Sequence, residues 1–377
     1  MQTMKILVVG GGIAGLSLSI FLQNKGFKDI TLVEKEKDWA NLGFGVNIWG
    51  IGRKMLRELG IDKDLEKGAY FVPASINSRS NKELAEINFK HFEKYGGHNF
   101  IISRDLFHKL LIKKLNGCKV LMETSLNKVE NIENSVRVTF SDGKIEGFDL
   151  VIGADGINSQ VRDLVFGKGK VDHSGWTIKL AYLPQNYNYP KEAYYLTEKR
   201  NNILFFPMKH SCFFGFSEYK SRHRKKDFVD VSLFSDYLNS IGWNDDQIKK
   251  MSNMKKIKTN IAFVKEREWF KGRVVLIGDA KHAMSPITGM GCSMAMEDAF
   301  VLSEELSKNE SLETSLKKFA KRRGKRIWLA RNIEKINSFF LMVKTNNGFR
   351  IRDFLRTVLP LESIDNLILH RFFSQKI

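Results

Sequence analysis

Cysteine is scarce in this sequence: its 377 residues contain only Cys118, Cys212 and Cys292. The three cysteines lie far apart, their number is odd, and their spacing matches no metal site. Neither a disulfide framework nor a zinc centre is therefore expected. Unpaired thiols are typical of a reduced compartment, so we expect a cytoplasmic protein without a bound metal.

Long apolar runs are also lacking. No stretch reaches the roughly 18 apolar residues that a membrane span requires. Three glycines interrupt the first apolar stretch, which continues into a charged strand end, so we do not interpret it as a signal peptide. The sequence has no internal repeat, low-complexity linker, serine-triad pattern or Walker phosphate loop. Two domains are the default for this length.

Acidic residues are outnumbered by basic ones, which gives a net charge of +19. Such a charge suits nucleic acid, an anionic membrane surface or anionic ligands such as NADPH. The basic residues are spread widely, so a generally basic, solvated surface is the simplest interpretation. The densest run, Lys321 to Arg326, is interpreted as a solvated helix face or a domain brace. We expect no stable nucleic-acid partner, while peripheral membrane contact stays open.

The first thirty-odd residues carry the clearest pattern. They predict a strand (Lys5 to Val9), a glycine turn with the spacing G-x-G-x-x-G, an apolar helix, and a second strand (Ile30 to Val33). The turn lets a pyrophosphate approach the backbone at the helix N-terminus. Glu34 ends the second strand, where a carboxylate accepts the ribose hydroxyls of an adenosine. Strand, turn, helix, strand and acid together predict a dinucleotide site.

Further glycines and two more strand ends extend the pattern. The segment 42–48 contains glycines that permit close approach to a ligand, and Ser103 is a plausible N-cap that places Arg104 in the first turn of a helix. A hairpin is predicted over 136–148, and the apolar strand 150–152 leads into Asp155. Buried strands with such ends form the ligand-binding edge of parallel sheets.

The third strand end is the most informative. The apolar strand Val274 to Ile277 runs into Gly278 and Asp279, and the turn Pro286 to Gly291 follows before a helix. Backbone N–H groups at Gly289 to Gly291, at a helix N-terminus, would stabilise negative charge on a bound ligand.

Together these motifs resemble the class A, single-component FAD-dependent monooxygenases. This group includes hydroxylases of the salicylate and urate type, zeaxanthin-type epoxidases and tetracycline-inactivating flavoproteins. The resemblance covers nearly the whole chain. It implies that Glu34 holds the adenosine ribose, Arg104 the pyrophosphate and Asp279 the ribityl chain, and that Asp155 helps to bind FAD and the nicotinamide cofactor. Two departures stand out: Lys281 replaces a usual small residue and Met290 a frequent Gln.

The fold class implied is α/β, with a Rossmann-like FAD-binding domain of the p-hydroxybenzoate-hydroxylase type, an inserted and mostly antiparallel β-sheet substrate domain, and C-terminal helices. We expect the FAD-binding domain over 1–70, 97–171 and 268–310. The substrate domain is expected over 71–96 and 172–267, and a helical segment over 311–377. The expected cofactor contacts are Gly10, Gly12, Ile13, Ala14, Gly15, Glu34, Lys35, Asn47, Arg104, Asp155, Asp279, Pro286, Gly289, Met290 and Gly291.

The function implied is a monooxygenase that uses NADPH or NADH and O2. Through a flavin C4a-hydroperoxide it hydroxylates or epoxidises an aromatic or polycyclic small molecule, as a monomer or homodimer. Two alternatives stay open: a flavin-dependent halogenase or oxidase/reductase without oxygen insertion, and a flavin-containing binding protein with a basic surface for nucleic acid or membrane. The basic balance favours NADPH.

Candidate substrate contacts come from aromatic strands. Phe205, Phe206, Phe214, Phe216 and Pro286 are the candidates, and strand alternation predicts that only some of the phenylalanines face a pocket while the others form core. His282 is a candidate for a general base. Its position beside the flavin turn favours a structural role, because the cofactor supplies the oxidant.

Overall fold

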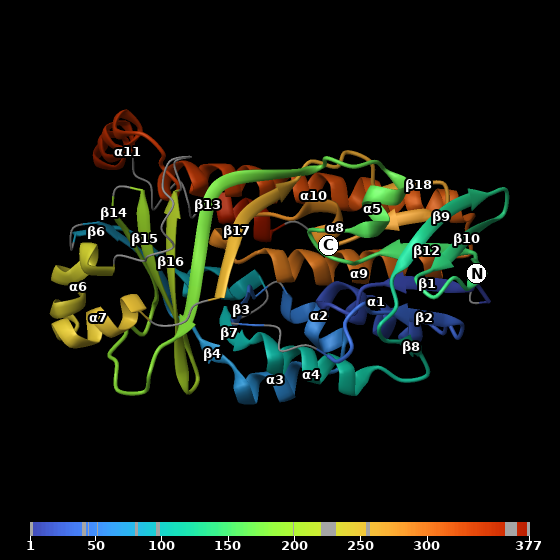
Figure 1. The fold of residues 1–377 in the computed structure, drawn as a ribbon, viewed down its shortest axis with the longest axis horizontal. Coiled ribbons are helices and arrows are strands. Elements are labelled where there is room, and N and C mark those ends of the chain that lie inside the picture. Colours follow the sequence, from blue (N-terminus) through green and yellow to red (C-terminus); the bar gives the residue numbers. More distant parts are fainter. Residues whose placement is uncertain are drawn as a thin grey trace.

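The structure is a computed structural model that describes residues 3–39, 43, 45–50, 52–79, 82–95, 99–198, 200–219, 231–253, 257–358 and 368–374. Leu42 and Phe44, in the expected glycine-rich loop, lie outside these ranges, as do 359–367 and 375–377 of the expected C-terminal segment. Figure 1 shows an elongated molecule with one large sheet at each end and a long helix across the top.

The first large sheet is built from short apolar runs. Its order is β18-β19-β12-β1-β2-β8, and every pairing is parallel except that of β18 with β19. Strands that are buried on both faces read as continuous apolar runs. The strands are β1 (Ile6–Val9), β2 (Ile30–Val33), β8 (Lys119–Leu121), β12 (Leu150–Gly153), β18 (Phe270–Lys271) and β19 (Val274–Leu276).

Both faces of this sheet are covered. Helices α1 (Ile13–Asn24) and α9 (Gly291–Ser307) pack together on one face, where the rings of Phe21 and Phe300 meet edge to face. A three-stranded antiparallel sheet, β9 (Leu126–Ile132), β10 (Ser135–Phe140) and β11 (Ile145–Phe148), covers the other. The hairpin expected over 136–148 is therefore confirmed.

The second large sheet has the order β17-β13-β16-β15-β14-β5-β6, and all its pairings are antiparallel except β14 with β5. One face packs against α6 (Ser235–Ser240), α7 (Asp245–Asn253) and the turn η2 (Val231–Phe234). The strands are β5 (Ala74–Arg79), β6 (Lys82–Asn88), β13 (Val171–Tyr182), β14 (Ala193–Glu198), β15 (Asn201–Met208), β16 (Ser211–Tyr219) and β17 (Ile257–Val264).

A small sheet of β4 (Tyr70–Phe71), β7 (Phe100–Ser103) and β3 (Gly45–Ile48) lies between the two large ones. Short helices surround it: α2 (Gly52–Glu58), α3 (Asp62–Gly68) and α4 (Arg104–Lys114), with the turn η1 (Phe89–Tyr95). Short α5 (Gln160–Val165) and α8 (Asp279–His282) follow two of the strand ends of the parallel sheet, and the turn η3 (Pro286–Thr288) precedes α9.

The chain continues into α10 (Leu312–Leu341), which packs on α9 and runs across the top of the molecule in Figure 1, and then into α11 (Asn346–Val358). Within the described ranges, none of the helices combines the length and apolar character needed to cross a bilayer.

Candidate functional site

A continuous cleft connects the parallel sheet with the seven-stranded sheet. Its first part, with a volume of about 320 Å³, lies at the glycine turn after β1; we call it the fingerprint end. Its second part, of about 340 Å³, lies between the seven-stranded sheet and the start of α9; we call it the α9 end. Both parts are lined by Gly12, Arg104, Ala154 and Gly156, so they form one trough.

The glycines of the fingerprint turn have separate tasks. Gly10 has a φ of +106°, and a Cβ there would lie 2.6 Å from the Ala154 carbonyl oxygen. A Cβ on Gly15 would lie 1.9 Å from the Gly10 oxygen. Gly15 is therefore required for helix–strand packing and, unlike Gly10, lines neither end of the cleft among the described residues. Gly12 faces open space within 4 Å, as a backbone that receives a phosphate must.

The start of α1 is left uncapped. Gly12 offers no side-chain hydrogen bond, and the first turn contains no acidic residue. The first N–H groups of a helix have no intrahelical acceptor, and they carry the positive end of the helix dipole. With Ile13 and Ala14 lining the α9 end, this terminus is suited to an anion in the middle of the cleft.

Glu34 lies at the fingerprint end directly after β2. Its Oε2 accepts a hydrogen bond from the Gly11 N–H at 2.7 Å, and its Oε1 accepts one from the Glu36 N–H at 3.1 Å. These bonds fix the carboxylate toward the cleft, where a ribose hydroxyl would donate to it. Lys35 also lines this end, and its ammonium lies on the surface, 3.7 Å from the Glu36 carboxylate.

Two aromatic residues at the fingerprint end were missed at the sequence level. Trp39 and His108 meet edge to face with ring centroids 5.5 Å apart, and His108 Nε2 lies 2.8 Å from the Gly11 carbonyl oxygen. Burial lowers the pKa of His108, although the Gly11 carbonyl opposes this. The neutral ring then donates to Gly11 and holds the turn. The helical spacing of Arg104 and His108 was the available signal, since i and i+4 share a face.

Arg104 is the first residue of α4, as expected, and Ser103 caps this helix by accepting a hydrogen bond from the Leu106 N–H at 3.4 Å. The side chain of Arg104 lines both ends of the cleft, and its Nε is buried without an acceptor among the described residues. A buried guanidinium N–H without a partner is costly. A phosphate in the trough would supply the missing acceptor.

The two aspartates at strand ends differ in their surroundings. The Asp155 carboxylate accepts hydrogen bonds from Ser159 Oγ at 2.5 Å and from the N–H groups of Gln160 and Val161, so it caps α5. Burial raises the pKa of Asp155 against these bonds. Asp279 lies in the α9 end and is open to the cleft. Loss of hydration in the cleft raises the pKa of Asp279, and nearby His282 and Arg104 oppose that rise.

The turn before α9 offers fewer donors than its sequence indicated. The Gly289 N–H donates to the Pro286 carbonyl at 3.0 Å, and the Met290 N–H donates to Thr288 Oγ1 at 3.4 Å. Of the three expected donors, Gly291 alone is left for a ligand, and Cys292 joins it as the second residue of an uncapped helix. Pro286, Gly289 and Gly291 line the α9 end, and Gly291 faces open space within 4 Å.

Asn47 on β3 stands where the cleft meets a third cavity. A Cβ on Gly289 would lie 2.7 Å from Asn47 Nδ2, so the Gly289 backbone and the Asn47 side chain are in close contact. Asn47 Oδ1 is buried and has no donor among the described residues. A ligand at this position would supply the missing donor.

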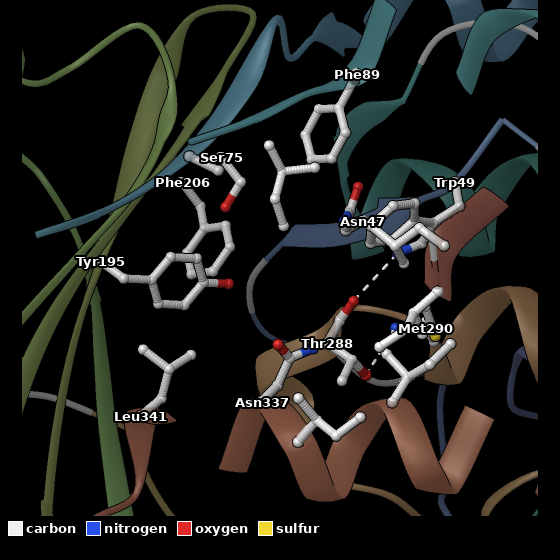
Figure 2. A pocket seen from close by; sticks show the side chains of 16 residues that line it. Asn47, Trp49, Ser75, Phe89, Tyr195, Phe206, Thr288, Met290, Asn337 and Leu341 are labelled. Atoms are coloured by element: carbon white, nitrogen blue, oxygen red, sulfur yellow. Dashed lines mark hydrogen bonds between the residues drawn. The ribbon is translucent and has the colours of Figure 1, made fainter. Parts of the chain in front are cut away.

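The third cavity, which we call the chamber, opens beside the α9 end; both are lined by Asn47, Tyr195 and Phe206 (Figure 2). Its volume is about 60 Å³. The Trp49 indole N–H donates to the Thr288 carbonyl at 3.1 Å and thereby fixes the turn before α9 against the chamber wall. The remaining lining residues are Ser75, Ile87, Phe89, Ala193, Met290, Ile333, Ile336, Asn337, Leu341, Ile368 and Leu369. None of the described residues that line the chamber is Asp, Glu, His, Lys or Arg.

The expected phenylalanine contacts require correction. Phe206 lines both the chamber and the α9 end, but Phe205, Phe214 and Phe216 lie on the opposite face of the sheet. There they pack with α6, α7 and η2 and are almost fully buried, so they form core. The second phenylalanine in the cleft is Phe213, the cross-strand partner of Phe206. Pro286 lines the α9 end and is not among the described residues around the chamber.

The signal for Phe213 was present in the sequence. Lys209 and His210 form the two-residue loop of the hairpin between β15 and β16, with Met208 opposite Ser211. A two-residue loop fixes the register, so counting back pairs position 206 with 213 and 205 with 214. Cross-strand partners share a face of the sheet.

The two departures from the family pattern occupy different places. The Met290 side chain is buried and lines the chamber. Lys281 is not among the described lining residues; its ammonium donates to the Glu266 carbonyl at 2.9 Å and lies over the Trp269 ring. Burial lowers the pKa of Lys281 to about 8.

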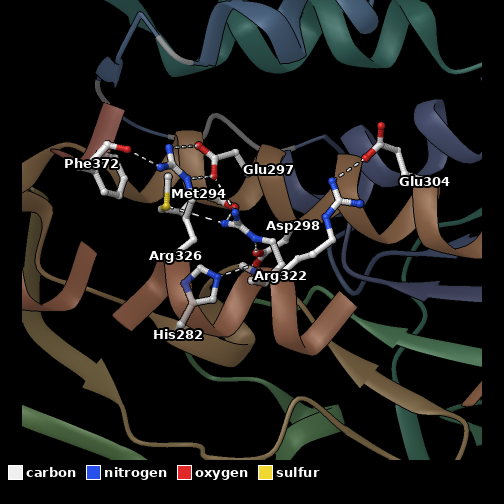
Figure 3. Close-up of polar contacts among 10 residues, drawn as sticks. His282, Met294, Glu297, Asp298, Glu304, Arg322, Arg326 and Phe372 are labelled. Carbon is white, nitrogen blue, oxygen red and sulfur yellow. Dashed lines mark hydrogen bonds and ion pairs between the residues drawn. The ribbon is translucent and has the colours of Figure 1, made fainter. Parts of the chain in front are cut away.

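His282 belongs to a buried ion network (Figure 3). Its Nε2 lies 2.5 Å from Asp298 Oδ2, and Arg323 Nε donates to Asp298 Oδ1 at 2.6 Å. Burial alone would raise the pKa of Asp298, but His282 and Arg323 bring it down to about 2. Because His282 is buried in this network and lines no part of the cleft or chamber among the described residues, its role is structural.

The basic run of α10 is a brace on its inner side. Arg323 also donates to Glu297 at 2.6 Å, and Arg326 donates to Glu297 at 2.8 Å and to the Phe372 carbonyl at 2.6 Å. Arg322 pairs with Glu304 and Glu305. These arginines join α10 to α9 and to residues 368–374, as the brace interpretation requires (Figure 3).

The cleft fits FAD, which is a long dinucleotide that carries a flavin ring. The open Gly12 and Gly291 backbones, the orphaned Arg104 Nε and two uncapped helix starts lie along one trough, with carboxylates at Glu34 and Asp279. Anionic groups suit the helix starts and the arginine, while ribose and ribityl hydroxyls suit the carboxylates.

Comparison with known proteins agrees with this geometry. The family model described as "FAD binding domain" matches residues 3–331. A flavin-dependent monooxygenase of Legionella longbeachae is 29% identical over 317 residues, covering 81% of each chain. The 6-hydroxynicotinate 3-monooxygenase of Bordetella bronchiseptica is 26% identical over 324 residues, covering 79% of this chain and 81% of that protein. The crystal structure of a single-residue variant of HpxO from Klebsiella pneumoniae, complexed with FAD, superposes with a TM-score of 0.82 and 21% identity over 98% of both chains.

Proposed function

The chain belongs to the FAD-binding family of class A flavoprotein monooxygenases, and on this basis we propose that the chamber beside α9 receives an uncharged aromatic substrate. The protein is an FAD-dependent monooxygenase. When bound, FAD supplies the redox chemistry, because it takes reducing equivalents from NAD(P)H and activates O2 for insertion into the substrate.

The residues of the chain hold and orient the cofactor. Glu34 would accept hydrogen bonds from the ribose hydroxyls at the fingerprint end, and the start of α1 with Arg104 would bind the diphosphate. Asp279 would accept hydrogen bonds from hydroxyls of the ribityl chain. The N–H groups of Gly291 and Cys292 lie at the positive end of α9, where they would stabilise negative charge on the flavin ring.

The observation that carries the substrate proposal is the composition of the chamber wall. The described lining contains Trp49, Phe89, Tyr195, Phe206 and aliphatic side chains, and its polar groups are neutral amides and hydroxyls. A carboxylate buried in such a wall would lose its hydration without gaining a cationic partner, which is strongly unfavourable. An uncharged ring loses little hydration and gains contact with the aromatic wall.

The size of the chamber limits the substrate further. Its 60 Å³ is smaller than the cavity of about 150 Å³ that holds benzene in an engineered protein core. A substrate ring therefore extends from the chamber past Phe206 into the α9 end, toward Gly291. Asn47, Tyr195 and Asn337 are placed to hydrogen-bond a neutral polar substituent.

The proposal is tested by screening uncharged ring compounds for stimulated NADPH oxidation, followed by mass spectrometry. A product heavier by 16 Da that carries label from ¹⁸O₂ supports oxygen insertion. Stimulated oxidation that yields hydrogen peroxide alone would indicate an oxidase, and halide incorporation would indicate a halogenase. The net charge of +19 leads us to propose NADPH over NADH as the reductant, which parallel assays with NADH check directly.

We propose a cytoplasmic location on the evidence of the cysteines. Cys118, Cys212 and Cys292 are all free thiols. Burial raises the pKa of the Cys118 thiol to about 11, and Cys212 and Cys292 are also well shielded. Free thiols of this kind persist in a reducing compartment.

A further inference from the structure

The outer face of α10 combines lysines with large aromatic side chains. From residue 317 onward, seven described side chains of this helix are exposed: Lys317, Lys318, Lys321, Lys325, Trp328, Lys335 and Phe339. We call them the lysine–aromatic strip. Five of its members are cationic, two are aromatic and none is acidic, although Lys317 and Lys318 at its start pair with Glu313 and Glu310. Trp328 is 66% exposed and Phe339 48% exposed, which is unusual for side chains of this size.

Helical geometry places these residues on one face. At 100° per residue, Lys321, Lys325, Trp328, Lys335 and Phe339 fall within an arc of about 80°. Arg323 and Arg326 of the same helix point the other way and are buried against Glu297. The helix is therefore divided between an inner face that braces α9 and an outer face that is basic and aromatic.

From this arrangement we propose that the lysine–aromatic strip docks the enzyme on an anionic phospholipid surface. Lysines attract the negative headgroups, and Trp and Phe between them insert at the boundary between headgroups and acyl chains. The net charge of +19 adds long-range attraction to such a surface. No helix of the described ranges is suited to cross the bilayer, so the contact is peripheral.

Two other partners fit the strip less well. A nucleic-acid duplex would engage the lysines through its phosphates, but its bases are stacked inside the double helix and give no reason for two exposed aromatic side chains between the lysines. A second copy of the chain would bring the same strip face to face across a two-fold axis, where the lysines would repel each other. An anionic bilayer suits both components at once.

The proposal also connects the surface to the substrate, and this link rests on the proposed function. The inner face of α10 supplies Ile333, Ile336, Asn337 and Leu341 to the chamber wall. The strip and the chamber are thus separated by the width of one helix, about 10 Å. An uncharged apolar ring concentrates in a bilayer, so docking by this face brings the chamber close to the substrate that is dissolved there.

The test is flotation of the FAD-loaded enzyme with vesicles of 30% phosphatidylglycerol in phosphatidylcholine, and with pure phosphatidylcholine as reference. We expect binding to the anionic vesicles only, weakened about tenfold or more in the Lys321/Lys325/Lys335→Gln variant. Trp328→Ser should weaken it several-fold at unchanged salt dependence. FAD content should be unchanged in both variants, which keeps this test independent of the proposed substrate.

Matched controls lie on or beside the three-stranded sheet of β9, β10 and β11. Ile145→Ser removes an equally exposed apolar side chain, and Lys128/Lys144/Lys168→Gln removes three exposed charges. Both should bind vesicles as the wild type does. Equal binding to neutral vesicles, or equal loss in the controls, overturns the proposal. Two further results would overturn it. One is lysine-dependent binding to DNA without binding to vesicles, and the other is a dimer that dissociates in Trp328→Ser while no form of the enzyme binds vesicles.

Discussion

The rings of Phe206 and Phe213 are stacked, with centroids 4.6 Å apart and planes 16° from parallel. The two residues are cross-strand partners on β15 and β16, and both line the α9 end of the cleft. Their sequence neighbours Phe205 and Phe214 form the adjacent pair, which faces α6 and α7 instead. The sheet thus directs one aromatic pair to the cofactor cleft and the next to the core.

This division predicts opposite outcomes for two neighbouring substitutions. Phe206→Ser should retain most of the FAD but release a larger share of NADPH oxidation as hydrogen peroxide, because water enters between the chamber and the α9 end. Phe205→Ser should leave coupling unchanged and lower the free energy of unfolding by about 3–5 kcal/mol, as expected for a lost core aromatic. Peroxide formed per NADPH consumed is the measurement. Identical coupling in both variants would place the substrate elsewhere.

Arg104 should contribute strongly to FAD affinity. Its buried Nε has no acceptor among the described residues, so a cofactor phosphate would complete a charge-assisted hydrogen bond. Arg104→Ala is expected to weaken FAD binding by about 1.5–3 kcal/mol, measured by fluorescence titration of the apoprotein. Arg57→Ala, an exposed arginine on α2, is the control and should bind FAD normally. An unchanged dissociation constant for Arg104→Ala would exclude its contact with the diphosphate.

Glu334 should make stability depend on pH near neutrality. Burial raises its pKa to about 7, although the Ser285 N–H that donates to it, Arg331 and Lys335 act in the opposite direction. Because the folded-state pKa lies above the unfolded value, the protonated form is favoured by folding. The contribution of Glu334 to the free energy of unfolding is fully present below pH 4.5 and is lost as the pH rises through 7.

The matching experiment compares urea unfolding at about pH 5.5 and about pH 8.0. Between these two pH values the free energy of unfolding of the wild type should fall by about 2 kcal/mol more than that of Glu334→Gln, since the amide cannot ionise. Glu313→Gln replaces an exposed carboxylate on the same helix and should follow the wild type. A Glu334→Gln variant that loses as much stability as the wild type would show that Glu334 ionises normally in the folded protein.

Much of the fold and the cofactor cleft followed from local sequence patterns. The run Ile6–Val9, the glycine turn and Glu34 are contiguous or nearly so, and their geometry is dictated by strand, turn and helix rules that act over a few residues. The same is true of Ser103 and Arg104, where an N-cap fixes the next residue in the first helical turn. Gly291 likewise starts α9 within reach of the cleft.

The chamber was harder to predict because its walls come from distant segments. Trp49, Tyr195, Asn337 and Leu369 meet there only through the packing of the seven-stranded sheet, α10 and residues 368–374. The prediction that Phe214 and Phe216 contact the substrate failed. Alternation shows that neighbouring side chains of a strand point to opposite faces of the sheet, but it does not show which face meets the cofactor. The arginines of the run 321–326 were separable from its lysines only once α9 showed where the acidic partners lie.

The central claim is that an uncharged ring in the chamber receives oxygen at the α9 end of the cleft. It is tested most directly with pairs of ring compounds that differ only in carboxamide against carboxylate, such as 6-hydroxynicotinamide and 6-hydroxynicotinate, assayed for ¹⁸O incorporation from ¹⁸O₂. The account predicts labelled products from carboxamide members alone, with the yield reduced in Phe206→Ser and retained in Phe205→Ser. Labelled product from the carboxylates, at yields equal to or above those of their partners, would contradict it.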